Sequence, residues 1–134
     1  MEEINLIQKG STVLVADDDR MFCVMLKQFF EANGYYVVTV EDGEQAVNAF
    51  MQQQEIEVIM LDGDMPEMDG FAACEMIRST DRGAGAPIFI VTALEGEAAL
   101  DCAMAVEASD YITKPVNWPE LRNKLSCVME FDLA

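Results

Sequence analysis

Residues 58–70 read VIMLDGDMPEMDG, a short apolar run that stops at an acid, Asp62. An uninterrupted apolar run such as VIML at 58–61, within the strand expected at 57–61, is typical of a strand covered on both faces of a parallel sheet. The turn residues that follow lead into a helix expected at about 71–79. The stretch therefore predicts a buried strand whose end presents a carboxylate.

The same alternation of strand and helix continues along the whole chain. Strands are expected at 12–16, 36–40, 57–61, 88–92 and 110–113, and helices at about 44–53, 71–79 and 97–107. One more helix is predicted before Asn33-Gly34, with its inward face formed by Phe22, Met25, Leu26, Phe29 and Phe30. The last helix is predicted from a capping box at Asn117 and Glu120, with Leu121, Leu125 and Val128 inward.

This order predicts an α/β protein, (βα)5, in which right-handed crossovers place helices on both faces of a parallel sheet. The expected architecture is a doubly wound, flavodoxin-like three-layer sandwich with strand order 2-1-3-4-5. At 134 residues the chain is one domain, large enough to bury a core without disulfides or a structural metal. We expect an extension at 1–10, the folded domain at 11–131 and a tail at 132–134.

The net charge of the chain argues against some classes of binding partner. The 8 basic and 25 acidic residues leave a net charge of −17, which opposes direct binding to nucleic acid or to anionic lipid. Neither a membrane-length apolar run nor the profile of a signal peptide is found, so we expect a cytoplasmic protein.

The cysteines are widely spaced, without a C-x-x-C motif, and the chain has no histidine to complete a zinc site. All four are predicted to be reduced packing residues within helices: Cys23, Cys74, Cys102 and Cys127.

Polar residues at the strand ends predict a site. In the order 2-1-3-4-5 the ends of the first and third strands are adjacent, which makes Asp17, Asp18 and Asp62 neighbours. Two unit charges about 4 Å apart repel by about 4 kcal/mol at an effective dielectric near 20, so the cluster calls for a cation. Carboxylates with room for water suit Mg²⁺, while Lys114 and Thr92 at the same edge suit phosphate. The set indicates phosphoryl transfer to an aspartate.

Four ordered motifs resemble one family. VLVADDD, VIMLDGDMPEMDG, IVTA and YITKP are similar, in order and spacing, to the receiver domain of two-component response regulators, over about residues 11–131. The resemblance implies a domain that is phosphorylated by a sensor histidine kinase or a histidine phosphotransfer protein. It also implies a downstream effector domain or protein, and it is compatible with a homodimer through the fourth helix, fifth strand and fifth helix.

The resemblance also implies roles for single residues. Asp62 would be the phosphoacceptor, and Asp17 and Asp18 would hold Mg²⁺ together with Asp62 and the backbone carbonyl of Asp64. Lys114 would pair with the phosphoryl group, and its bond to Pro115 is expected to be cis.

Two further residues would form the switch. Thr92 would move to bind a phosphoryl oxygen, and Tyr111 would swing inward behind it. Asp19, by contrast, is interpreted as an acid that stabilises the start of a helix. Glu107 stands where similar receivers carry glycine, which leaves the shape of that helix end open.

Two alternatives remain at this point. An aspartate-based phosphatase of the haloacid dehalogenase type also has an apolar strand ending in D-x-D, supplied here by Asp62 and Asp64. That superfamily places its metal-binding acid pair after the lysine, whereas here Asp17 and Asp18 precede everything. A receiver-like module that never takes phosphate is the other alternative, and the intact set of acids, threonine and lysine argues against it.

Overall fold

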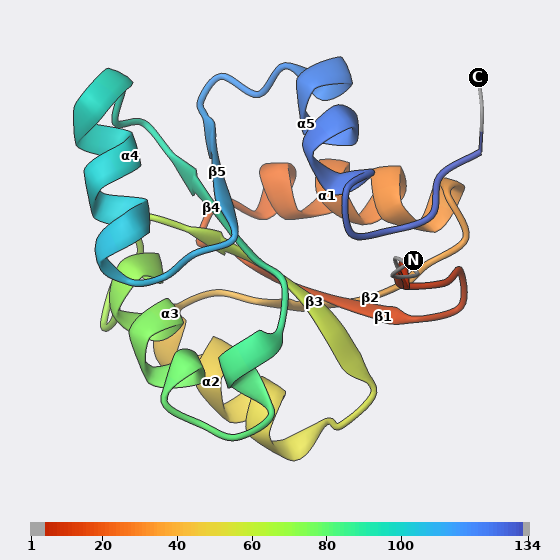
Figure 1. Cartoon of the computed structure of the whole chain (residues 1–134), viewed down its shortest axis with the longest axis horizontal. Helices are drawn as coiled ribbons and strands as arrows, with labels where there is room; N and C mark the ends of the chain where they lie inside the picture. Colours follow the sequence, from red (N-terminus) through yellow and green to blue (C-terminus); the bar gives the residue numbers. More distant parts are fainter. Residues whose placement is uncertain (1–4, 133–134) are drawn as a thin grey trace, which may run out of the picture.

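The computed structural model describes residues 5–132 and contains one five-stranded parallel sheet (Figure 1). The strand order is β2-β1-β3-β4-β5, as predicted from the sequence. The strands are β1 (Thr12–Ala16), β2 (Tyr36–Val40), β3 (Ile56–Asp62), β4 (Ile88–Thr92) and β5 (Asp110–Thr113). The flavodoxin-like (βα)5 fold is therefore confirmed, and the ends of β1 and β3 are adjacent.

Helices cover both faces of this sheet, with α1 and α5 on one side and α2 and α3 on the other (Figure 1). Their bounds are α1 (Arg20–Ala32), α2 (Gly43–Gln52), α3 (Gly70–Arg78), α4 (Gly96–Ala105) and α5 (Trp118–Leu125), and a 3-10 turn spans Gly83–Gly85. The predicted cap of α5 is confirmed, since the Asn117 side chain accepts from the Glu120 N–H at 3.0 Å. Within residues 5–132 no helix is both long and apolar enough to cross a membrane.

The core has one layer on each side of the sheet. On the α1 and α5 side, Val13, Val58 and Val91 pack against residues of the helices, and on the other side Leu14, Ile59 and Ile90 do so. Alternate residues of β1, β3 and β4 thus point to opposite faces, and both faces are buried. This explains why the central residues of these strands are apolar on both faces.

The inward face of α1 is narrower than predicted. Leu26 and Phe30 are buried, but Met25 is exposed, and Cys23 takes a buried position that the pattern had not assigned. Residues 23, 26 and 30 are spaced i, i+3 and i+7, so they form the stripe that faces the sheet. The apolar residues of α1 cover a wider arc than the buried stripe, so their spacing alone does not show which of them face the sheet.

The prediction of four packing cysteines is half wrong. Cys23 and Cys74 are buried, whereas Cys102 on α4 and Cys127, beyond the end of α5, are exposed. Burial raises the pKa of both buried thiols to about 11, so they stay protonated and unreactive at neutral pH.

Residues near the two ends of the described chain pair with each other on the α1 and α5 side of the sheet. Ile7 pairs with Met129 in a parallel bridge, and the Tyr35 hydroxyl donates to the carbonyl of Glu130 at 2.6 Å. Residues 1–4 of the predicted extension and residues 133–134 of the predicted tail lie outside the described residues. The division into an extension at 1–10, a domain at 11–131 and a tail at 132–134 stays a prediction.

Candidate functional site

The first part of the site lies just beyond β1, where Asp17 is buried and Asp18 is exposed. Asp19 accepts from the N–H groups of Met21 and Phe22 at 3.0 and 3.2 Å, so it caps α1, as interpreted from the sequence. Because the helix begins only after Asp19, the two preceding acids remain in the loop above the strand end. The Asp17 carboxylate also accepts from the Asp19 N–H at 2.8 Å, which fixes its direction.

The second part is Asp62, the buried last residue of β3. Its carboxylate accepts from the N–H of Asp64 at 3.2 Å. The first turn of α3 packs closely beneath it: a Cβ on Gly70 would stand 2.2 Å from the carbonyl oxygen of Asp62. Glycine at position 70 therefore lets α3 approach the strand end and hold Asp62 in place.

The third part comes from β4 and β5. The Lys114 ammonium lies 3.3 Å from Asp17 Oδ2 and 3.3 Å from Asp62 Oδ1. Thr92 is the buried last residue of β4, its hydroxyl accepts from the Leu94 N–H at 3.0 Å, and its carbonyl accepts from the Lys114 N–H at 2.8 Å. The Lys114-Pro115 bond is cis, as expected.

Burial and the neighbouring charges shift the pKa values of Asp17 and Lys114. Burial raises the pKa of Asp17 to about 6, and the nearby Asp62 carboxylate adds to the rise. Burial alone would lower the pKa of Lys114, but Asp17 and Asp62 outweigh it and the pKa is raised. The ammonium is thus held charged between carboxylates that it only partly neutralises.

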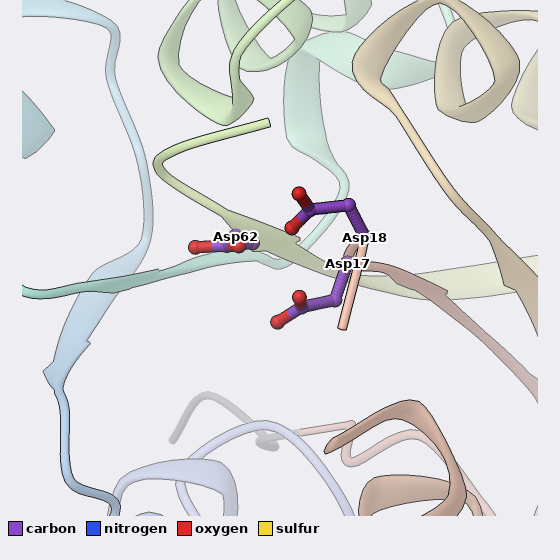
Figure 2. Close-up of side chains that lie close together, drawn as sticks. All are labelled: Asp17, Asp18 and Asp62. Atoms are coloured by element: carbon purple, nitrogen blue, oxygen red, sulfur yellow. The ribbon is translucent and has the colours of Figure 1, made fainter. Parts of the chain in front are cut away.

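The three acids form a compact oxygen donor set. Ligand oxygens of Asp17, Asp18 and Asp62 all lie within 4.8 Å of one another. Figure 2 shows the carboxylates of Asp17 and Asp18, from the end of β1, directed toward Asp62 at the end of β3. Carboxylate oxygens alone, with one acid open to solvent, fit Mg²⁺, which takes oxygen ligands and retains water.

The predicted role of Asp64 concerns its backbone carbonyl and stays a prediction, while the side chains of Asp64 and Tyr111 lie outside the cluster. The side chain of Asp64 is exposed and does not belong to the donor set, although its N–H contacts Asp62. Tyr111 is half-buried on β5, where the Lys124 ammonium lies 4.6 Å from the centre of its ring. The structure therefore brings Asp17, Asp18, Asp62, Lys114 and Thr92 to one edge and leaves Tyr111 at the side of the sheet.

Sequence reasoning missed two contributors to the site. Phe22 was assigned only to the core, yet the Lys114 ammonium lies 5.0 Å from the centre of its ring. Gly63 stands where a Cβ would meet the Phe71 ring at 2.8 Å and Thr92 at 3.3 Å. The glycine after Asp62 was a visible signal for close packing, whereas nothing in the helical spacing could reveal the contact of Phe22.

The comparisons with known proteins agree with this geometry. The family model described as "Response regulator receiver domain" matches residues 13–126, and the chain belongs to this family. A probable transcriptional regulator, ycf27 of Guillardia theta, is 35% identical over 123 residues, covering 92% of this chain and 47% of the relative. The transcriptional regulatory protein CpxR of Escherichia coli is 32% identical over 119 residues, covering 87% of this chain and 48% of the relative. The chain spans about half the length of these relatives.

Solved structures show the same likeness. The chemotaxis protein CheY4 of Vibrio cholerae is similar with a TM-score of 0.82 at 28% identity, covering 90% of this chain and 99% of that one. The receiver domain of the sensor histidine kinase PA1611 of Pseudomonas aeruginosa, solved with magnesium in its active site cleft, has a TM-score of 0.78 at 28% identity and covers 87% of this chain and 95% of that one.

Proposed function

We propose that this receiver domain accepts a phosphoryl group on the carboxylate of Asp62, from a sensor histidine kinase or a histidine phosphotransfer protein, in a Mg²⁺-dependent reaction. The observation that carries the proposal is the position of Asp62: it is buried at the end of β3, within ligand distance of two further acids and 3.3 Å from the Lys114 ammonium. The proposal keeps the cytoplasmic location expected from the sequence.

In the proposed transfer, a carboxylate oxygen of Asp62 forms a bond to the phosphorus of a phosphohistidine. The phosphorus–nitrogen bond breaks, and its electron pair returns to the imidazole, so the product is an aspartyl phosphate. Asp17, Asp18, Asp62 and the backbone carbonyl of Asp64 would hold the metal. Bound Mg²⁺ supplies positive charge against the phosphoryl oxygens. Lys114 reaches the same oxygens as a point charge that moves no proton.

We further propose that phosphorylation switches the surface formed by α4, β5 and α5, with Thr92 and Tyr111 as the coupling residues. Inverting an equilibrium from 1:99 to 99:1 needs a preference of about 5.5 kcal/mol for the active state. Charge-assisted hydrogen bonds of about 1.5–3 kcal/mol each, from Lys114 and from a Thr92 that has moved inward, can supply this together with the metal. The switched surface would meet an effector domain, an effector protein or a second copy of the chain.

The test is to incubate the protein with a small phosphodonor and Mg²⁺ and to follow intact mass and released phosphate. A receiver gains the mass of one phosphoryl group as a stable addition. Sustained release of phosphate over many turnovers would instead identify a phosphatase of the haloacid dehalogenase type. No added mass in the presence of Mg²⁺ would identify a module that does not take phosphate.

Asp64→Asn sharpens the test because the substitution keeps the backbone carbonyl and removes only an exposed carboxylate. In the receiver, labelling survives and Mg²⁺ binding weakens by about 1 kcal/mol through lost long-range attraction. In the phosphatase the same carboxylate would be the general acid and base, so its loss would reduce turnover by roughly a hundredfold or more. Titration with Mg²⁺ and phosphate release, measured beside the parent protein, separate the two results.

A further inference from the structure

Helix α4 is apolar on its outer side as well as its inner side. It buries only two small residues, Ala99 and Ala103. Larger apolar side chains point outward: Leu100 is 44% exposed, Met104 is 66% exposed, and Leu94, just before the helix, is 40% exposed. Single exposed apolar residues are ordinary, but large apolar side chains gathered on the outer face of a helix indicate that this face is covered by a partner.

The charge around this face has one sign. From residue 83 to residue 113 the chain has no lysine or arginine, and its five acids there are Glu95, Glu97, Asp101, Glu107 and Asp110. Within α4, positions 97, 100, 101 and 104 follow the spacing i, i+3, i+4 and i+7, so two acids and two large apolar side chains share one face.

Of these five acids, Asp110 is paired with a lysine. Lys124 of α5 lies 3.5 Å from Asp110 and 3.7 Å from Glu120, and it also donates to the carbonyl of Tyr111. By contrast, no ion pair among residues 5–132 includes Glu97 or Asp101. The outer face of α4 is therefore left acidic and apolar.

We propose that this α4 face, defined by Glu97, Leu100, Asp101 and Met104, binds a basic amphipathic helix of a partner protein or domain. Leucine-like side chains of the partner would cover Leu100 and Met104, while its lysines or arginines would meet Glu97 and Asp101. This inference deepens the proposed function, because it names the chemistry of the partner at the surface that phosphorylation of Asp62 would switch.

A second copy of the chain does not fit the same face. A two-fold dimer brings identical patches together, so each copy would set its own Glu97 and Asp101 against those of the other. The net charge of −17 adds repulsion over the whole surface. Among the partners that the proposed function leaves open, the α4 face therefore favours an effector domain or protein over a second copy of the chain.

Helix α1 has the opposite character and serves as an internal contrast. Met21, Val24 and Met25 are exposed on it, but Arg20 and Lys27 flank them, and residues 20–30 contain no acid. A basic helix would therefore be repelled by α1 and attracted by α4, although both present apolar side chains.

The test uses a designed peptide of roughly 18 residues, about five helical turns, with leucines on one face and lysines elsewhere. A matched peptide carries glutamate in place of lysine. Binding to the full chain is measured by calorimetry at about 0.15 M salt, where interactions between distant surface charges are screened, and is located by amide chemical shifts. We expect the lysine peptide to bind with shifts centred on α4, and the glutamate peptide not to bind.

Paired variants separate specific binding from general attraction to an acidic protein. Glu97→Gln with Asp101→Asn should weaken binding about fivefold, whereas Glu55→Gln with Glu57→Gln, which removes the same charge from exposed sites elsewhere, should change it less than about twofold. Leu100→Ser with Met104→Ser should weaken it about tenfold or more, and Met51→Ser with Met76→Ser, also exposed, should not. Circular dichroism checks that each variant folds.

Three results would overturn the inference: no binding of the lysine peptide, equal weakening by the α4 pairs and their controls, or shifts centred on α1. A dimer seen by sedimentation in the presence of Mg²⁺ and beryllofluoride, and abolished by the Leu100 and Met104 changes, would assign the face to a second copy instead. Peptide binding is measured both without and with Mg²⁺ and beryllofluoride. Labelling of Asp62 is measured separately by intact mass. Failure of the phosphoryl transfer and failure of the α4 inference are therefore distinguishable.

Discussion

The two edges of the sheet use charge in opposite ways. At the carboxyl edge, beyond the ends of β1 and β3, three acids crowd together with Lys114 as the cation that contacts two of them. At the opposite edge, Arg82 donates to the carbonyls of Phe50 and Gln53 at 2.7 and 3.0 Å, and its guanidinium lies 3.8 Å from the centre of the Phe50 ring.

Arg78 acts like Arg82 on the neighbouring segments. It donates to the carbonyls of Glu107 and Gly83, each at 2.8 Å, and to that of Ala86. These two arginines bind backbone carbonyls of several chain segments at the places where these segments meet. The comparison indicates that the edge with Arg78 and Arg82 stabilises the fold. At the carboxyl edge, the negative charge of the three acids exceeds the positive charge of Lys114 and is left for a bound cation to balance. Removing an arginine should therefore lower the free energy of unfolding, whereas removing an acid at the carboxyl edge should raise it in the absence of metal.

The largest expected effect on stability is at the arginine edge. Arg82→Met removes one hydrogen bond from each of two carbonyls and the contact with Phe50, so we expect the free energy of unfolding to fall by about 3 kcal/mol. Urea denaturation measures the change. Arg20→Met is the matched control, because Arg20 is exposed and makes one ion pair, and it should change stability by less than about 0.5 kcal/mol. Equal losses in the two variants would contradict the role given to Arg82.

The next effect has the opposite sign and depends on pH. The pKa of Asp17 is about 6 in the folded protein and 3.8 ordinarily, so the folded state binds the proton more tightly. The resulting stabilisation is present below about pH 4 and is lost as the pH rises through about 6. A shift of two units corresponds to about 3 kcal/mol, so Asp17→Asn should gain about 2 kcal/mol on the metal-free parent between pH 4 and 7. Unfolding in EDTA at several pH values measures the difference.

Asp81→Asn, at an exposed position, is the control for that measurement and should follow the pH dependence of the parent. Added Mg²⁺ should reverse the advantage of Asp17→Asn, because it would stabilise only the protein that retains the carboxylate. A parent and an Asp17→Asn variant with the same pH dependence would show that the acids of the carboxyl edge do not oppose folding.

The smallest effect concerns Glu107, whose carbonyl accepts from Arg78 at the arginine edge. Its φ is 59°, so the helix end keeps the left-handed shape that glycine usually provides, although the residue is a glutamate. Glu107→Gly should raise the free energy of unfolding by about 1 kcal/mol, because glycine adopts this φ without strain. Glu75→Gly, inside α3, should lower it by about the same amount. Thermal unfolding of both variants tests the prediction, and destabilisation by Glu107→Gly would contradict it.

The carboxyl edge could be predicted from the sequence far better than the arginine edge. Apolar runs that stop at Asp17, Asp62 and Thr92 identify strand ends directly, and the parallel topology then brings these ends together. Arg78 and Arg82 gave no such signal, because they bind carbonyls of segments distant in sequence.

Other features also depend on contacts that no local pattern contains. The stripe of α1 was assigned too widely, which placed Met25 in the core. The pairing of Ile7 with Met129 joins residues that are far apart in sequence, and the exposure of Cys102 follows from how few large side chains α4 buries. Periodicity predicts which elements form, whereas the exact rotation and end contacts of an element are set by its neighbours.

The most direct test of the central claim is labelling of Asp62→Asn beside the parent protein. Both are incubated with a small phosphodonor and Mg²⁺, and their intact masses are measured. Peptide mapping then locates any added phosphoryl group. The parent should gain one phosphoryl group, mapped to Asp62, and the variant should gain none while remaining folded by circular dichroism. Asp81→Asn should be labelled like the parent. A phosphoryl group that persists on Asp62→Asn, at any other residue, would contradict the assignment of Asp62 as the phosphoacceptor.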